Sequence, residues 1–158
     1  MIKKTLSYII LILLLGCGFK PLYKEYDVSN LTFKQINYSG NNELVYLLKN
    51  NLNLKEQKDY NGHTINLIIR ENFSSADKNT QGITTNENLT ISIILNVKDG
   101  TSENLIYETF EESARLFISN NLSEYDTKKK LIKNELSKIL AQKIKFRLMI
   151  LENQNKKK

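Results

Sequence analysis

The sequence predicts an α+β fold in which two helices pack on one face of a four-stranded, mostly antiparallel sheet, in the order β-α-β-β-β-α. Two kinds of periodicity predict it. Residues 89–97 alternate apolar and polar side chains, which is typical of a strand with one buried face. Residues 123–151 instead repeat apolar side chains every three to four positions, as an amphipathic helix does. That helix has to bury its apolar stripe, and the sheet is the available surface.

The first half of the predicted domain begins with a strand over residues 31–36, where apolar and polar side chains alternate. The polar run at residues 39–42 ends this strand, and Asn41 or Asn42 can cap the next helix by accepting a backbone hydrogen bond. We expect that helix over about residues 43–54. Its apolar stripe consists of four leucines: Leu44, Leu47, Leu48 and Leu52.

The second strand is predicted over residues 64–70, and a polar segment follows it at residues 72–88. Two interpretations of this segment remain open. It is either a polar loop, or the two flanking strands extend past the core as an exposed hairpin. The hairpin is favoured by three residues with a preference for strands, Thr80, Thr84 and Thr85.

The third and fourth strands are joined at Asp99-Gly100, a pair that tolerates the positive φ of a tight turn. The returning strand, residues 104–118, has mixed faces. Glu108 and Glu112 share a parity with five apolar residues: Ile106, Phe110, Ala114, Leu116 and Ile118. We expect a bulge or a partly exposed end to account for the mixture.

The terminal helix begins after Ser123, which is a suitable cap. Its buried side is predicted to contain Leu136, Leu140, Ile144 and Leu148, completed by Ile132, Ile139 and Leu151. Its water-facing side is predicted to contain Lys129, Lys133, Lys138, Lys145 and Glu152.

The start of the chain is typical of an export signal that ends at a lipidated cysteine. Lys3 and Lys4 give a basic start, residues 6–15 are apolar, and Gly16 precedes Cys17, the chain's only cysteine. We expect cleavage before Cys17, with a diacylglycerol on its thiol and an acyl group on the new α-amine. An uncleaved signal-anchor or a secreted protein with a stray cysteine is disfavoured, because the apolar run is shorter than the roughly 20 residues that span a membrane.

Length and charge restrict the class of protein. Cleavage would leave about 140 of the 158 residues, enough for one domain with a hydrophobic core. The predicted parts are a signal peptide at 1–16, an anchor and linker at 17–30, the α+β domain at 31–152 and a basic tail at 153–158. Loss of two lysines with the signal lowers the formal charge from +6, so the mature chain is only mildly basic. We therefore expect no nucleic-acid partner.

The residues around the cysteine resemble the LptE family of lipopolysaccharide-assembly lipoproteins, in which a Gly-Cys-Gly-Phe-x-Pro-Leu-Tyr opening recurs. The matching stretch here is Gly16-Cys17-Gly18-Phe19-Lys20-Pro21-Leu22-Tyr23. The terminal helix is also similar to the family's, with Glu124-Tyr125 near its start and Leu140-Ala141-Gln142-Lys143-Ile144-Lys145-Phe146-Arg147-Leu148 near its end. The lysine-rich residues 128–133 depart from the Ala- and Arg-rich family pattern.

The resemblance implies an α+β sandwich that sits inside the large outer-membrane β-barrel LptD, helps it to fold and assists delivery of lipopolysaccharide to the outer leaflet. Arg70 and Lys98, on outward strand faces, are the candidate residues for binding the glycolipid's anionic groups, and ordinary surface charge is the alternative. The non-acidic Gly18 favours sorting to the outer membrane. Two other functions stay open: an auxiliary lipoprotein of a lipid-transporting ABC system, and an independent binding module or hydrolase.

The sequence shows few residues that could perform catalysis. His63 is the only histidine and lies in a predicted turn, where a solvated surface residue is the simpler interpretation. No cysteine and histidine cluster suits zinc, and no glycine-rich phosphate loop follows a strand. The carboxylates Glu108, Glu111 and Glu112 are more simply charges that discourage unwanted strand pairing than an acid–base pair. We expect a protein that is not an enzyme, with no cofactor and no metal.

Overall fold

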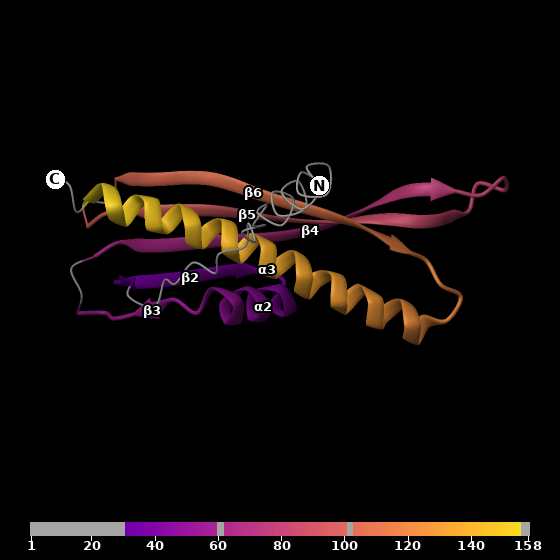
Figure 1. Cartoon of the computed structure of the whole chain (residues 1–158), viewed down its shortest axis with the longest axis horizontal. Helices are drawn as coiled ribbons and strands as arrows, with labels where there is room; N and C mark the ends of the chain where they lie inside the picture. The colour runs from indigo at the N-terminus through magenta and orange to yellow at the C-terminus, as the bar shows by residue number, and fades with distance from the viewer. Residues whose placement is uncertain (1–30, 60–61, 101–102, 156–158) are drawn as a thin grey trace, which may run out of the picture.

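A computed structural model describes residues 31–59, 62–100 and 103–155 (Figure 1). The predicted signal, lipidated cysteine and linker lie outside these residues. Four strands form one sheet in the order β2-β4-β5-β6, and the two helices α2 and α3 lie on one face of it, so the predicted fold is confirmed. The elements are β1 Thr32–Phe33, β2 Gln35–Gly40, α2 Asn42–Leu52, β3 Lys55–Glu56, β4 Thr64–Lys78, β5 Thr84–Lys98, β6 Asn104–Phe117 and α3 Leu122–Asn155.

The first strand was predicted over residues 31–36, and this extent is wrong. The chain bends at Lys34, which separates β1 from β2, and β2 then runs on to Gly40. The sequence contains a reason for the bend. Phe33 and Ile36 both pack on the core, and an odd spacing cannot place two residues on one face of a regular strand. β1 pairs in parallel with the short β3, which the sequence did not predict, and β2 pairs in parallel with β4 across α2.

The long hairpin favoured for residues 72–88 is confirmed. β4 and β5 pair from Thr64 and Lys98 at one end to Lys78 and Thr84 at the other, and Figure 1 shows the hairpin reaching far beyond α2. Its loop is held by Asn79, whose Oδ1 accepts hydrogen bonds of 2.9 Å from two backbone N–H groups downstream. Side-chain amides that close a turn in this way explain why so polar a segment is ordered.

The core lies between the helices and one face of the sheet. The strands contribute odd-numbered residues of β4 and β5, such as Ile65 and Ile93, and the helices contribute leucines. The predicted stripe of α3 is confirmed for Leu136, Leu140, Ile144, Leu148 and Leu151, which are buried, and Ile132 packs against the core partly buried. The placement of Ile139 on the buried side is wrong: it is only partly buried and is not among the core residues, because one residue turns the helix by about 100° away from Leu140. α3 itself begins one residue before Ser123 and continues to Asn155.

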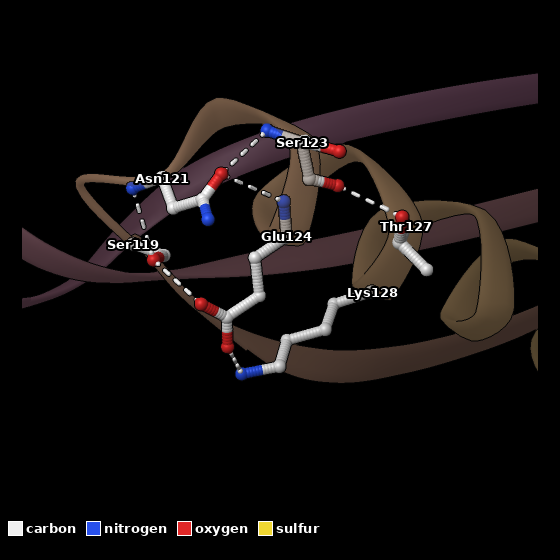
Figure 2. A network of polar contacts seen from close by, with 6 residues as sticks. All are labelled: Ser119, Asn121, Ser123, Glu124, Thr127 and Lys128. Atoms are coloured by element: carbon white, nitrogen blue, oxygen red, sulfur yellow. Dashed lines mark hydrogen bonds and ion pairs between the residues drawn. The ribbon is translucent and has the colours of Figure 1, made fainter.

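The start of α3 is capped by Asn121 and not by the predicted Ser123 (Figure 2). Asn121 Oδ1 accepts hydrogen bonds from the backbone N–H groups of Ser123 and Glu124, at 3.1 and 3.4 Å. The Glu124 carboxylate accepts hydrogen bonds from Lys128 Nζ at 2.7 Å and from Ser119 Oγ at 3.1 Å. These two donors, Lys128 first, hold the pKa of Glu124 below its ordinary value. A carboxylate in the first turn also suits the positive end of the helix dipole.

Tyr125 fastens this end of α3 to the sheet. Its hydroxyl donates a 2.9 Å hydrogen bond to Glu87 Oε1 on β5. Burial and this carboxylate raise the pKa of Tyr125 to about 12, so the hydroxyl keeps its proton at neutral pH. Beside it, Lys129 Nζ lies 4.4 Å from the ring centre of Phe73 on β4, within the range of a cation–π contact.

Lys133 is buried and not water-facing as the sequence predicts. Its side chain is only 5% exposed, and Nζ lies 2.8 Å from Glu43 Oε2 on α2 and 2.9 Å from Glu71 Oε2 on β4. Glu71 also accepts a 3.3 Å hydrogen bond from Asn41, whose own Oδ1 caps α2 as predicted. Burial alone would lower the pKa of Lys133, but the hydrogen bonds to the two carboxylates outweigh it and raise the pKa. One ammonium group therefore joins α2, α3 and the sheet.

Replacement of this cation should destabilise the fold. Lys133→Met keeps the aliphatic stem but leaves Glu43 and Glu71 close together without a counter-charge, so we expect the free energy of unfolding to fall by about 3 kcal/mol. Urea denaturation followed by circular dichroism measures it. Lys138→Met, on an exposed position of the same helix, is the matched control and should stay within about 0.5 kcal/mol of the wild type. Equal effects from both variants would contradict a structural role for the buried ion cluster.

Gly40 ends β2 at a point where no side chain fits. Its φ is +134°, and a Cβ at this position would lie 2.1 Å from the carbonyl oxygen of Ile69, its partner on β4. Gly82, in the hairpin loop, also has a positive φ of +78°, but a Cβ there would meet nothing within 4 Å. A comparison of substitutions at the two glycines therefore distinguishes the free-energy cost of a positive φ from the free-energy cost of a steric clash.

Alanine substitutions at these two positions should differ in effect. Gly82→Ala carries only the conformational cost, about 1 kcal/mol, whereas Gly40→Ala adds a backbone clash and should push β2 away from β4. We expect a clearly larger fall in the melting temperature for Gly40→Ala, measured by thermal denaturation. If Gly82→Ala were the more damaging variant, the close approach of β2 to β4 would be wrong.

Candidate binding surface

The face of the sheet opposite the helices is a broad polar surface. The helices cover the face that carries odd-numbered residues of β4 and β5, so the even-numbered residues of these strands face the other way. The strand registers add odd-numbered residues of β2 and β6 to this open face. Most of its side chains are Asn, Ser and Thr. Within the described part of the chain no helix covers this face, so it is the candidate surface for a partner.

A row of amide side chains crosses the open face near one end. Asn37, Asn66 and Asn96 are in register on β2, β4 and β5, and Tyr107 continues the row on β6. Asn37 Nδ2 donates a 2.9 Å hydrogen bond to Asn66 Oδ1, and Gln35 Nε2 donates one of 2.9 Å to Asn37 Oδ1. Gln35, Asn37 and Asn66 therefore hold each other in place and give this end of the face a fixed pattern of donors and acceptors.

An aliphatic pair lies in the middle of this polar face. Ile68 on β4 and Ile94 on β5 are directly paired, and Ile68 is 39% exposed. Neither was predicted as a site residue, although the sequence contains a signal: each is one member of an Ile-Ile doublet that breaks the alternation of its strand. A partly exposed aliphatic pair surrounded by polar groups matches the usual anatomy of a protein interface, with an apolar centre and a polar rim.

Arg70 and Lys98, the two candidate ligand-binding residues, both lie on the open face as predicted, but the structure does not bring them together. Arg70 pairs with Ser92, whereas Lys98 is six residues further along β5 and pairs with Thr64. That offset corresponds to about 20 Å along the strands. The two cations cannot hold one phosphate group between them.

The returning strand contains an irregularity, as predicted, but this irregularity does not explain the mixed face. The register of β5 and β6 shifts once, at Val97/Lys98, and the two strands pair regularly past Glu108 and Glu112. The two carboxylates share a face with apolar residues because α3 supplies cations to them. Arg147 Nε lies 2.7 Å from Glu108 Oε2, and Lys143 forms an ion pair with Glu112. Charge pairing with a helix, rather than irregular backbone, explains the mixed face.

Two further features could be considered for chemistry: His63, and a pocket that shares Gln35 with the open face. His63 lies just before β4, and its carbonyl accepts a 2.9 Å hydrogen bond from the Lys34 N–H. A shallow pocket nearby is lined by Lys34, Gln35, Glu56 and Lys58. Glu56 Oε2 accepts a 3.2 Å hydrogen bond from the backbone N–H of Ile36, so this carboxylate has a structural role. Among the described residues, no group of three or more His, Cys, Asp or Glu side chains could hold a metal ion. The part of the chain that carries Cys17 is not described.

The described helices include none that is both long and apolar enough to cross a membrane.

Comparison with known proteins defines the fold and goes no further. No family model matches the sequence, and no curated protein matches it. Solved structures do match. The rare lipoprotein B from Shewanella oneidensis is 16% identical, with a TM-score of 0.58 over 78% of this chain and 99% of that one. A putative lipoprotein from Caulobacter crescentus is 13% identical, with a TM-score of 0.57 over 76% and 91%.

An uncharacterized lipoprotein B from Nitrosomonas europaea shows the same likeness, with 12% identity and a TM-score of 0.57 over 81% of this chain and 88% of that one. At such identities the likeness concerns the fold: this chain has the α+β architecture of those lipoproteins over nearly their full length.

Proposed function

We propose that this protein is a lipid-anchored outer-membrane lipoprotein of the LptE type, which binds a large β-barrel of the LptD kind and assists lipopolysaccharide delivery. The observation that carries the proposal is the open sheet face, which is mostly polar and has the Ile68–Ile94 pair on its two central strands. The stretch from Gly16 to Tyr23 and the fold shared with several lipoproteins support it.

The chemistry of the open face suits the inside of a barrel. The lumen of an outer-membrane barrel is polar, because its strands turn apolar side chains to the lipid and polar ones inward. Amide side chains such as those of Asn37 and Asn66 both donate and accept hydrogen bonds, so they can match polar walls without burying a charge. Ile68 and Tyr107, which is 69% exposed, supply the apolar and aromatic area from which interfaces gain most of their energy.

The role that we propose is binding and not catalysis. Arg70 and Lys98 would act as two separate contacts for phosphate or carboxylate groups of the glycolipid, since the sheet keeps them about 20 Å apart. Charge-assisted hydrogen bonds of this kind are stronger than neutral ones. The lipid on Cys17 would hold the domain at the membrane, where two or three acyl chains give a stable attachment.

Site-specific photo-crosslinking from the open face tests the partner. A benzoylphenylalanine at Ile68 should form an adduct with a large outer-membrane barrel in intact cells, identified by mass spectrometry. The same group at Glu135, an exposed position of α3, is the control and should give less of that adduct. Equal adducts would overturn the assignment of the open face but leave the barrel partner standing. Recovery of an ABC permease would favour the auxiliary lipoprotein, and recovery of no partner would overturn the proposal.

Removal of the thiol tests the anchor separately. Cys17→Ala should accumulate as an unprocessed precursor that is not lipidated, with a changed gel mobility and lower recovery from the outer-membrane fraction. Gel mobility, metabolic labelling with a fatty acid and membrane fractionation measure this. Ser113→Ala, an exposed change in the folded domain, should be processed normally. A Cys17→Ala protein with wild-type mobility and fatty-acid labelling would contradict lipidation at this residue.

A further inference from the structure

Three exposed lysines lie at the end of the molecule where the predicted linker joins the domain. Lys34 follows β1, Lys55 lies on β3 and Lys58 follows β3, and we call this set the basic corner. The ion pairs among the described residues involve other cations. The same segments carry two carboxylates, Glu56 and Asp59, so positive charge is in excess. Figure 1 shows β3 at the end of the molecule away from the β4–β5 hairpin loop.

Backbone hydrogen bonds fix the position of the basic corner. β1 and β3 pair in parallel, and the N–H of Gln57 donates a 2.9 Å hydrogen bond to the carbonyl of Phe33. The N–H of Lys34 donates another, also of 2.9 Å, to the carbonyl of His63. Lys34 and Lys58 therefore line one pocket from a backbone that is held in place on both sides.

The pocket between these two lysines suits an anionic group. It has a volume of about 280 Å³, and Gln35 and Glu56 complete its lining. Glu56 already accepts the hydrogen bond from the N–H of Ile36, so its carboxylate is used within the fold. Two ammonium groups and an amide remain as donors. Charge-assisted hydrogen bonds from such groups are the usual way in which proteins hold phosphate.

The predicted lipid anchor would keep the basic corner close to a membrane surface. About 14 residues of chain separate Cys17 from Leu31, which directly precedes β1. Even at full extension they span no more than about 50 Å. The hairpin loop lies a further 15-residue strand away along β4, which is another 50 Å or so. Of the described domain, the basic corner is thus the part that the anchor brings to the bilayer first, and tethering raises its effective concentration there.

We infer that the basic corner binds the phosphate groups of anionic phospholipids in the membrane that holds the anchor, with Lys34 and Lys58 on either side of one headgroup. The proposal rests on the lipid anchor of the proposed function, but on neither the barrel nor the glycolipid. A basic patch beside an acyl chain is a second attachment signal, and each lysine near an anionic surface strengthens binding about fivefold. Docking in this way would direct the hairpin loop away from the bilayer.

Fluorescence quenching with the mature lipidated protein in vesicles tests the docking. A fluorophore on Gln57→Cys reports on the basic corner, and one on Gln81→Cys, in the hairpin loop, is the matched control. The vesicles contain phosphatidylcholine alone or mixed with phosphatidylglycerol, and a lipid with a quencher on its headgroup. We expect quenching at Gln57 to rise at least about twofold in the anionic vesicles, with no such rise at Gln81. High salt should remove the rise.

Charge reversal distinguishes this site from a general attraction of a basic protein. Lys34→Glu combined with Lys58→Glu should lower the ratio of docked to undocked protein at least about 25-fold. Lys130→Glu combined with Lys138→Glu, at exposed positions of α3, changes the net charge equally and should leave the quenching at Gln57 in place. Melting temperatures of both double variants are compared with the wild type to show that each is folded.

Each contrary result has a separate meaning. Equal quenching at Gln57 in both kinds of vesicle would overturn the docking, while protein that still floats with neutral vesicles would leave the anchor standing. Equal loss from the α3 pair, or stronger quenching at Gln81 than at Gln57, would also overturn it. Purified protein without a fatty acid would overturn the anchor and the docking together. The barrel partner is tested separately by the crosslink from Ile68.

Discussion

The structure depends on a buried cation at the meeting point of its two helices and its sheet. Lys133 of α3 binds Glu43 of α2 and Glu71 of β4, and Asn41 links Glu71 to the cap of α2. Apolar packing holds the helices on the sheet. The charge pairs add contacts of fixed geometry to this packing, at the cost of desolvating the ions. The cluster therefore joins both helices to the sheet at one point.

The covered face and the open face of the sheet differ in how their charged side chains are paired, and α3 is the cause of the difference. Arg147 and Lys143 neutralise the carboxylates of β6 on the covered face, so those groups are used internally. On the open face amides and hydroxyls outnumber the charged side chains, which include Arg70, Lys98, Glu111 and Arg115. Neutral hydrogen-bonding groups can be buried against a polar partner without stranding an ion, which suits the binding role that we propose.

Much of the fold could be predicted from periodicity, because strand and helix repeats differ and each apolar stripe needs cover. Two of the errors have one cause in common. Lys133 reads as a water-facing residue, and its partner Glu43 is 90 residues away, so only tertiary structure shows that it is buried. Glu108 suggested a bulge for the same reason, since Arg147 lies 39 residues further on. The aliphatic pair could have been predicted from the sequence, because Ile94 breaks the alternation of its strand. The lipidation predicted for Cys17 depends on the sequence alone, since the structure does not describe that residue.

Because of the long β4–β5 hairpin, local stability differs between the two ends of the sheet. None of residues 74–88 is buried, so this end is held by cross-strand hydrogen bonds and by the loop amide of Asn79 rather than by a core. Paired strands without a packed face are marginally stable in water. Amide hydrogen exchange should therefore be fast at the tip and slow around Leu95 and Leu140. The part of the sheet under the helices is therefore rigid, whereas the tip of the β4–β5 hairpin can change its conformation when it contacts another molecule.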